Sequence, residues 1–168
     1  MTIPLQPLVP TLLLSLHPEN TAAIITGKKV IEYRRRFFAE PFQAFVYTTG
    51  PNGGVNLFIT CDQPIKADAQ KLAAIGELIQ HDDYDELVRY FSANDTGLIV
   101  PITSYVQFPM IRLAELRRKF TNFVTPQGYT FLDKLERQAQ LTYFQQQPVL
   151  KTQTIDWTPK YRAIEALE

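Results

Sequence analysis

Residues that build disulfides and metal sites are scarce in this chain, which has one cysteine and two histidines among 168 residues. The single cysteine, Cys61, excludes an internal disulfide and indicates a reducing compartment. It ends an apolar, strand-like run, so we expect a small core residue rather than a nucleophile. His17 and His81 lie far apart and lack the spacing of zinc motifs. We therefore expect neither a bound metal nor a cofactor.

An excess of charge of one sign is also missing, because 17 basic residues balance 17 acidic ones. The chain has no overall field that attracts polyanions, so any binding of nucleic acid must come from a local patch or pocket. No apolar run approaches the roughly 20 residues that span a bilayer. The first apolar segment lacks preceding basic residues and is interrupted by prolines, which makes it a poor signal peptide. We expect a cytoplasmic protein with no membrane partner.

Length and element order predict one main domain of the α+β class. A chain of 168 residues can bury a core without disulfides or metal. Three prolines make residues 1–10 an extended arm. We place the main domain at residues 11–133 and a helical extension that packs on it at residues 134–168. Because strands do not alternate regularly with long helices, we expect a small mixed barrel with flanking helices rather than a parallel sheet.

Hydrophobic periodicity and turn residues predict the individual elements. The first helix begins at Pro18, and Gly27 is the left-handed residue that ends it. Pro101 places its strand at an edge or a bulge, and Trp157 anchors the tail on the body of the protein. The predicted strands are 11–16, 30–37, 44–49, 55–61 and 97–108, with 44–49 and 55–61 antiparallel across the turn at 50–54. The later predicted helices are 67–79, 82–92, 113–120 and 129–147.

Charged side chains gather on the second predicted strand, which otherwise resembles a core strand. Glu32, Arg34 and Arg36 share one face at a period of two. One interpretation is the solvated face of a sheet. The other is a charged cleft in which Lys29, Glu32 and Arg34 hold one another and a ligand. Arg35 has the opposite parity and is not a candidate, whereas the role of Arg36 stays open.

The spacing Gly27-x-Lys29-x-x-Glu32-x-Arg34, placed between an early helix and the second strand, resembles the signature of the ASCH family. The similarity extends to the first strand with His17-Pro18-Glu19 and to segments 46–49, 90–91, 96–102 and 108–117. It spans roughly residues 11–133 and implies a PUA-like β-barrel with flanking helices, to which the helical C-terminal extension at residues 134–168 is added. The chain departs from the family pattern at His17, where many members have lysine, and at Asn56, where they have glycine.

The resemblance implies a charged cleft beside the barrel that binds single-stranded RNA, a nucleotide or a nucleoside. Arg34 can make forked hydrogen bonds to a phosphate or a base edge, and Lys29 supplies a mobile positive charge. Glu32 can accept a hydrogen bond from an exocyclic amine. The expected ligand-binding residues are Lys29, Glu32, Arg34, His17 and Tyr47, with Gly27 as the structural turn. Tyr33 and Tyr105 are further candidates for stacking on a base.

Two other functions stay open. One bacterial branch that resembles this family hydrolyses the amide of N4-acetylcytidine, and in this hypothesis Lys29 beside Glu32 acts as base or nucleophile. That branch has threonine at the position of Glu32. It also needs a downstream carboxylate, for which the candidates are Asp62, Asp82, Asp83 and Glu86. The third hypothesis is a protein–protein adaptor that uses residues 134–168 as its docking surface.

Overall fold

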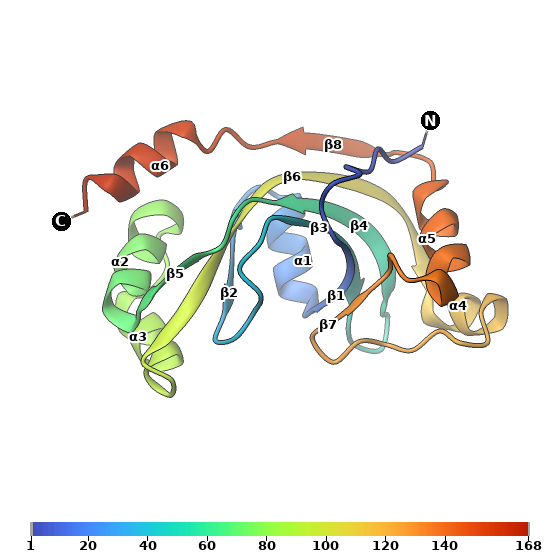
Figure 1. Ribbon diagram of the computed structural model, residues 1–168, viewed down its shortest axis with the longest axis horizontal. Helices are drawn as coiled ribbons and strands as arrows, with labels where there is room; N and C mark the ends of the chain where they lie inside the picture. The colour runs from blue at the N-terminus through green and yellow to red at the C-terminus, as the bar shows by residue number, and fades with distance from the viewer. Residues whose placement is uncertain (1, 168) are drawn as a thin grey trace.

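The computed structural model describes residues 2–167, which form one mixed sheet flanked by helices (Figure 1). The strands are β1 (Thr11–Leu16), β2 (Ile31–Arg34), β3 (Phe42–Thr48), β4 (Gly54–Cys61), β5 (Ile65–Asp68), β6 (Thr96–Arg112), β7 (Tyr129–Phe131) and β8 (Lys151–Thr154). The helices are α1 (Pro18–Ile25), α2 (Ala69–Gln80), α3 (Tyr84–Ser92), α4 (Leu113–Lys119), α5 (Gln138–Gln145) and α6 (Thr158–Glu165), with a 3-10 turn η1 (Leu135–Arg137). The predicted α+β class is confirmed.

The long strand β6 holds most of the sheet together. The strand order is β2-β6-β4-β3-β1-β7, and β5 and β8 also pair with β6. Figure 1 shows the sheet curled into a half-barrel, with α2 and α3 at one end and α4 and α5 at the other. Pro101 lies opposite Ile31 of β2, and the pairing of β6 with β4 shifts register just after it, between Ile102 and Ser104. This matches the bulge that Pro101 predicts.

The segment that leads into β2 folds as its local residues dictate. Proline at the first position of α1 and Glu19 in its first turn favour a helix start after His17. The helix ends at Thr26, and Gly27 follows with φ of 83°, a left-handed conformation that strains any residue with a Cβ. Ile31 then begins β2, which pairs antiparallel with β6. This strand is shorter than predicted and ends at Arg34.

The predicted hairpin is also confirmed. Strands β3 and β4 are antiparallel, and Gly50 in the turn between them has φ of 100°. Every residue of β3 is buried, because the strand lies between β4 and the parallel strand β1 and both faces of the sheet are covered. Alternate side chains therefore supply two separate cores, so that Phe45 packs with Phe58 and Phe144, whereas Val46 packs with Leu57.

A third core lies under the α2–α3 pair. Asp68 and Asp83 cap the two helices by accepting hydrogen bonds from backbone N–H groups in the first turn, as their positions favour. The apolar faces of both helices pack against β2 and the start of β6, around Leu72, Ile75 and Phe91. This packing sets the α2–α3 pair opposite α1, with β2 between them (Figure 1).

The prediction of one long helix over residues 129–147 is wrong. Tyr129–Phe131 instead forms β7 and pairs with β1, and Asp133 accepts a hydrogen bond from the backbone N–H of Thr11 at 3.0 Å. Aromatic residues favour a strand where a partner edge is free, and here β1 offers one. The helix α5 begins only at Gln138.

The tail and the N-terminal arm are both anchored to the body of the protein. Trp157 is buried and donates its indole N–H to the carbonyl of Ile102 at 2.8 Å, which confirms the predicted anchor. The tail is not only helical, because β8 joins the sheet along β6. Residues 2–10 form no helix or strand, yet Ile3 is fully buried and bonds the carbonyl of Gln145. No helix within residues 2–167 combines the length and apolar character needed to cross a membrane.

Candidate functional site: a charged cleft between two walls

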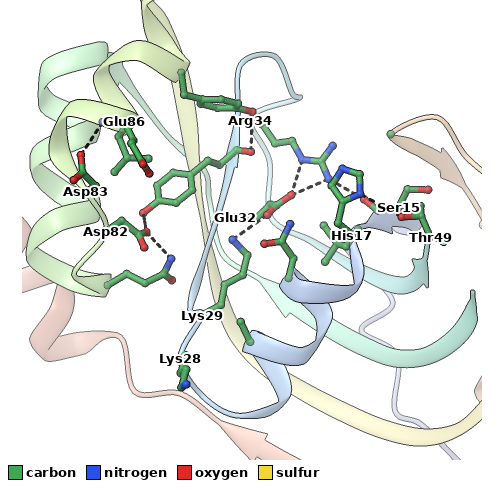
Figure 2. Close-up of a pocket in the computed structure, with 18 of the residues that line it drawn as sticks. Ser15, His17, Lys28, Lys29, Glu32, Arg34, Thr49, Asp82, Asp83 and Glu86 are labelled. Atoms are coloured by element: carbon green, nitrogen blue, oxygen red, sulfur yellow. Dashed lines mark hydrogen bonds and ion pairs between the residues drawn. The ribbon is translucent and has the colours of Figure 1, made fainter. Parts of the chain in front are cut away.

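A cleft of about 1010 Å³ opens between α1 and the α2–α3 pair, with β2 as its floor (Figure 2). One side is formed by the end of β1, the start of α1 and residues 126–128. The other side is formed by the end of α2 and the first turns of α3. The polar side chains that line the cleft are Ser15, His17, Asn20, Lys28, Lys29, Glu32, Tyr33, Arg34, Thr49, Gln80, Asp82, Asp83, Glu86, Tyr90 and Gln127.

Lys29, Glu32 and Arg34 form one ion-pair network on the floor of the cleft. Lys29 Nζ lies 3.2 Å from Glu32 Oε1, and Arg34 Nη2 lies 3.0 Å from Glu32 Oε2. Arg34 Nε donates a second hydrogen bond to Glu32 Oε2, and Nη2 reaches the carbonyl of Ser15 at 3.3 Å. The side chains of Lys29, Glu32 and Arg34 are 8%, 11% and 18% exposed. The sequence motif therefore converges on a single, nearly buried carboxylate that bridges two cations.

The backbone of β2 explains this convergence. Glu32 and Arg34 pair with Val100 and Leu98 of β6, so that their side chains emerge on the same face at a period of two. Lys29 comes from the turn after Gly27 and approaches the same carboxylate from the opposite direction (Figure 2). The spacing of the motif thus has a geometric reason.

Gln80 and Asp82 join the floor of the cleft to the α2–α3 side. Gln80 Oε1 accepts hydrogen bonds from the backbone N–H groups of Val30 and Ile31 at 2.7 and 2.9 Å. Its amide nitrogen donates to Asp82 Oδ2 at 2.7 Å, and the same oxygen accepts a hydrogen bond from the Tyr33 hydroxyl. Burial and the hydrogen bond to Asp82 raise the pKa of the Tyr33 phenol, so this tyrosine stays protonated.

His17 stands at the rim of the cleft. Its Nδ1 lies 3.3 Å from the Thr49 hydroxyl, which comes from the end of β3. The ring is exposed and faces the guanidinium of Arg34 across the rim (Figure 2). The expected ligand residues Lys29, Glu32, Arg34 and His17 are therefore brought together, whereas their role in binding stays a prediction.

Tyr47 does not line the cleft, contrary to expectation. Its side chain is buried in the core under α4, where its ring packs 6.4 Å from that of Phe123. Tyr105 is also buried, and its hydroxyl donates to the carbonyl of Ile25. Successive residues of β3 point to opposite faces, and Tyr47 falls on the face turned away from the cleft. Of the three tyrosines considered for stacking, only Tyr33 lines the cleft.

The cleft also contains carboxylates that the sequence could not assign. Asp82, Asp83 and Glu86 line the α2–α3 side of the cleft, across from the network (Figure 2). Asp62 lies elsewhere and accepts a hydrogen bond from Tyr161 at 2.6 Å. Cys61 is buried, and burial raises the pKa of its thiol well above the ordinary value, as suits a core residue. Among residues 2–167, no cluster of three or more His, Cys, Asp or Glu side chains could hold a metal ion.

The fold and the cleft define an α+β protein of the PUA-like class, in which a curled mixed sheet carries a charged cleft on one side. No protein-family model matches the chain. A curated relative, the ASCH domain-containing ribonuclease of Zymomonas mobilis, is 28% identical over 130 residues, which cover 74% of this chain and 86% of the relative.

Solved structures of the ASCH protein from Zymomonas mobilis share the fold. One aligns with a TM-score of 0.69 and 24% identity, covering 84% of this chain and 99% of that chain. A serine-to-alanine variant of the same protein aligns with a TM-score of 0.68, covering 80% and 98%. The fold is therefore that of ASCH structures, and the resemblance to the ASCH domain family is confirmed.

Proposed function

We propose that this protein binds single-stranded RNA or a nucleotide in the charged cleft, and that it does so in the cytoplasm. The observation that supports the proposal most directly is the Lys29–Glu32–Arg34 network on the floor of the cleft. A nearly buried ion-pair network is a poor source of stability, because desolvation of its charges offsets their attraction. Its place in a large cleft favours a role in ligand binding. The name of the relative, a ribonuclease, favours RNA as the ligand.

The network retains donors and acceptors for a ligand. Arg34 directs Nε and Nη2 at Glu32 and Ser15, which leaves the two N–H groups of Nη1 for a carbonyl or ring nitrogen of a base. The ammonium of Lys29 uses one of its three donors on Glu32. The oxygens of Glu32 keep lone pairs that can accept from an exocyclic amine. Such a mixture of donors and acceptors matches the edge of a nucleobase.

The charge of the cleft favours a base over a phosphate as the part of the ligand that enters. Four carboxylates and three cations line it, and these are Glu32, Asp82, Asp83 and Glu86 against Lys28, Lys29 and Arg34. The formal sum is therefore negative by one charge, with His17 taken as neutral. A phosphate group placed deep in this cleft would meet the carboxylate on its floor and those on its α2–α3 side. We infer that the base is inserted and that its phosphates lie outside.

Binding of labelled RNA tests the proposal. Fluorescence anisotropy with short single-stranded RNA oligonucleotides, and calorimetry with nucleosides and nucleotides, measure the affinity of the wild-type protein. Loss of the charged contacts in Arg34→Ala or Glu32→Ala should weaken binding at least about tenfold, which corresponds to one or two charge-assisted hydrogen bonds.

Arg112→Ala is the matched control. Arg112 is an exposed arginine outside the cleft that donates to the carbonyl of Asn52 at 2.8 Å. This control should bind like the wild type, and circular dichroism should show that all variants are folded. The proposal is wrong if the wild-type protein binds no member of the panel, or if Arg34→Ala binds as tightly as Arg112→Ala.

A second candidate function is cleavage of the bound RNA, which the name of the curated relative favours. This function requires the other placement of the strand, with a phosphate on the floor of the cleft. There Lys29 can stabilise negative charge that develops on the reacting phosphate, and Glu32 can exchange a proton with an attacking hydroxyl. If the protein has this activity, RNA cleavage should disappear in Lys29→Ala and persist in Arg112→Ala. Cleavage that is equal in Lys29→Ala and wild-type preparations would exclude this role for the cleft. N4-acetylcytidine, incubated in parallel, tests the amidohydrolase hypothesis with the same variants.

The adaptor hypothesis gains no support from the structure of the tail. Strand β8 belongs to the sheet, and Trp157 packs in the third core. Residues 134–167 are thus built into the domain, so their removal would disturb the fold. RNA binding remains the function that the geometry favours.

A further inference from the structure

A second hollow, of about 420 Å³, lies beside the cleft. It is formed by the loop after β2, by β5 and by the start of β6, which lie on the same side of the molecule (Figure 1). The residues that line this basic groove are Arg35, Arg36, Phe37, Ala39, Lys66, Asn94, Thr96, Gly97 and Leu98. They include three cations and no carboxylate, whereas the carboxylates outnumber the cations in the cleft.

Two contacts connect the basic groove to the cleft. The guanidinium of Arg35 lies 4.1 Å from the centre of the Tyr90 ring and donates from Nε to the carbonyl of Tyr90 at 2.8 Å. Tyr90 lines the cleft. On the other side of β2, the ring of Phe37 in the groove lies 5.7 Å from the guanidinium carbon of Arg34 in the cleft. The two hollows are therefore neighbours, separated only by these side chains, so a single ligand of sufficient length can reach both.

Two cations of the basic groove have no structural partner. Arg36 and Lys66 are exposed, and in the described part of the chain neither one forms an ion pair or a side-chain hydrogen bond. Exposed cations that line one hollow repel one another, and an anion relieves this repulsion. Arg35 differs, because its contacts with Tyr90 support the wall between the groove and the cleft.

We propose that the basic groove binds phosphates of the RNA strand whose base occupies the cleft. This inference rests on the proposed function and assigns base binding to the cleft and phosphate binding to the basic groove. The cleft has mixed charges suited to a base edge, and the groove has only positive charge, suited to the backbone that follows the base. The ligand is therefore a strand of at least two nucleotides, and an isolated nucleoside uses only the cleft.

Two double variants test whether the groove binds phosphates while the cleft binds the base. Arg36→Ala with Lys66→Ala removes two charges from the basic groove, and Arg118→Ala with Lys134→Ala removes two exposed charges at the opposite end of the molecule. Affinity for a short single-stranded RNA is measured by anisotropy over a range of salt concentrations, and nucleoside affinity by calorimetry. Because each phosphate contact on a single strand contributes about 0.7 to the slope of log affinity against log salt, the groove variant should have a slope shallower by about 1.4.

The expected result is a loss of RNA affinity of about tenfold or more in the groove variant, with nucleoside affinity unchanged. The inference is overturned if the groove variant and the control variant bind RNA with the same affinity and salt slope. In that case the proposed function still stands, provided that Arg34→Ala abolishes binding. Loss of nucleoside affinity in the groove variant would also count against the inference, because the nucleoside should contact only the cleft. If the wild-type protein binds neither RNA nor nucleosides, both the proposed function and this inference are wrong.

Discussion

Replacing Glu32 with alanine should lower the free energy of unfolding more than replacing an exposed charged residue does. Among residues 2–167, Glu32 is the only carboxylate that bridges Lys29 and Arg34, and both of its oxygens are used. In the variant the two cations remain in place, with side chains that are 8% and 18% exposed and no common counter-charge. The substitution changes the free energy of the unfolded chain much less, because water solvates all three charged groups there.

The magnitude follows from the contacts that are lost. Removing one partner of a buried ion pair costs about 3–5 kcal/mol. The cleft gives water some access to the network, and Arg34 keeps its bond to the Ser15 carbonyl, so we take about 3 kcal/mol. For a chain of this length each kcal/mol lowers Tm by about 2–4 °C, which gives a decrease of about 6–12 °C.

Equilibrium unfolding in urea, with the slope m checked for each variant, measures this change. The control is Glu136→Ala, because Glu136 is exposed and its side chain has no ion-pair partner within the described residues. The control should lie within about 0.5 kcal/mol of the wild type. A loss of less than about 1 kcal/mol in Glu32→Ala would refute the view that Glu32 holds two desolvated cations.

A triple variant separates stability from binding. Lys29→Met, Glu32→Leu and Arg34→Met together remove all three charges and keep similar side-chain volumes. Apolar replacement of a buried ion-pair network is often neutral or stabilising, so the triple variant should regain most of the stability lost in Glu32→Ala. It should still bind no RNA. Strong RNA binding by the triple variant would show that the network does not contact the ligand.

Three further predictions concern the surroundings of the cleft. Because the pKa of Tyr33 is raised from 10.0 in the fold, the unfolded chain loses this proton first, and stability should fall as the pH rises above 10; Tyr33→Phe should make the fall shallower in urea unfolding at successive pH values. Trp157→Phe leaves the Ile102 carbonyl without its donor and should cost about 1–3 kcal/mol, with faster proteolysis of the tail. In Gly27→Ala the added Cβ meets no neighbouring atom, so only the strain of the left-handed φ should lower stability, by about 1 kcal/mol in thermal unfolding. Gly27→Asn should lower it less, because asparagine tolerates this conformation better.

Local patterns predicted the parts of the fold and site that depend on neighbours in sequence. Pro18 and Gly27 bound α1 because each restricts or frees its own backbone. The alternation along β2 placed Glu32 and Arg34 on one face before any partner strand was known. The same reasoning failed for Tyr47, because alternation gives two faces and does not say which of them meets the cleft.

Contacts between distant segments could not be predicted in this way. Gln80 and Asp82 lie about 50 positions from their partners in and beside β2; nothing in the sequence marks Gln80, and Asp82 could not be told from the other candidate carboxylates. The residues of β7 were predicted as part of a helix from their local sequence. Their strand conformation depends on pairing with the free edge of β1, which is far away in the sequence. The basic groove was missed for a similar reason, since Lys66 joins Arg36 only through the pairing of β5 and β2 with β6.

The same distant contacts determine how the cleft receives its ligand. Gln80 bonds two backbone N–H groups beside β2, and Asp82 bonds Tyr33, so the α2–α3 side and the floor are held by direct hydrogen bonds. Gly76 of α2 packs so tightly on Tyr33 that an added Cβ would lie 2.5 Å from its hydroxyl. Because the α2–α3 side is fixed to the floor in this way, we expect the cleft to be open before a ligand arrives, and binding to order few groups on that side. On the proposed function, we therefore expect affinity to depend on the fit of the base and on the charges of the groove beside it, rather than on closure of one side over the other.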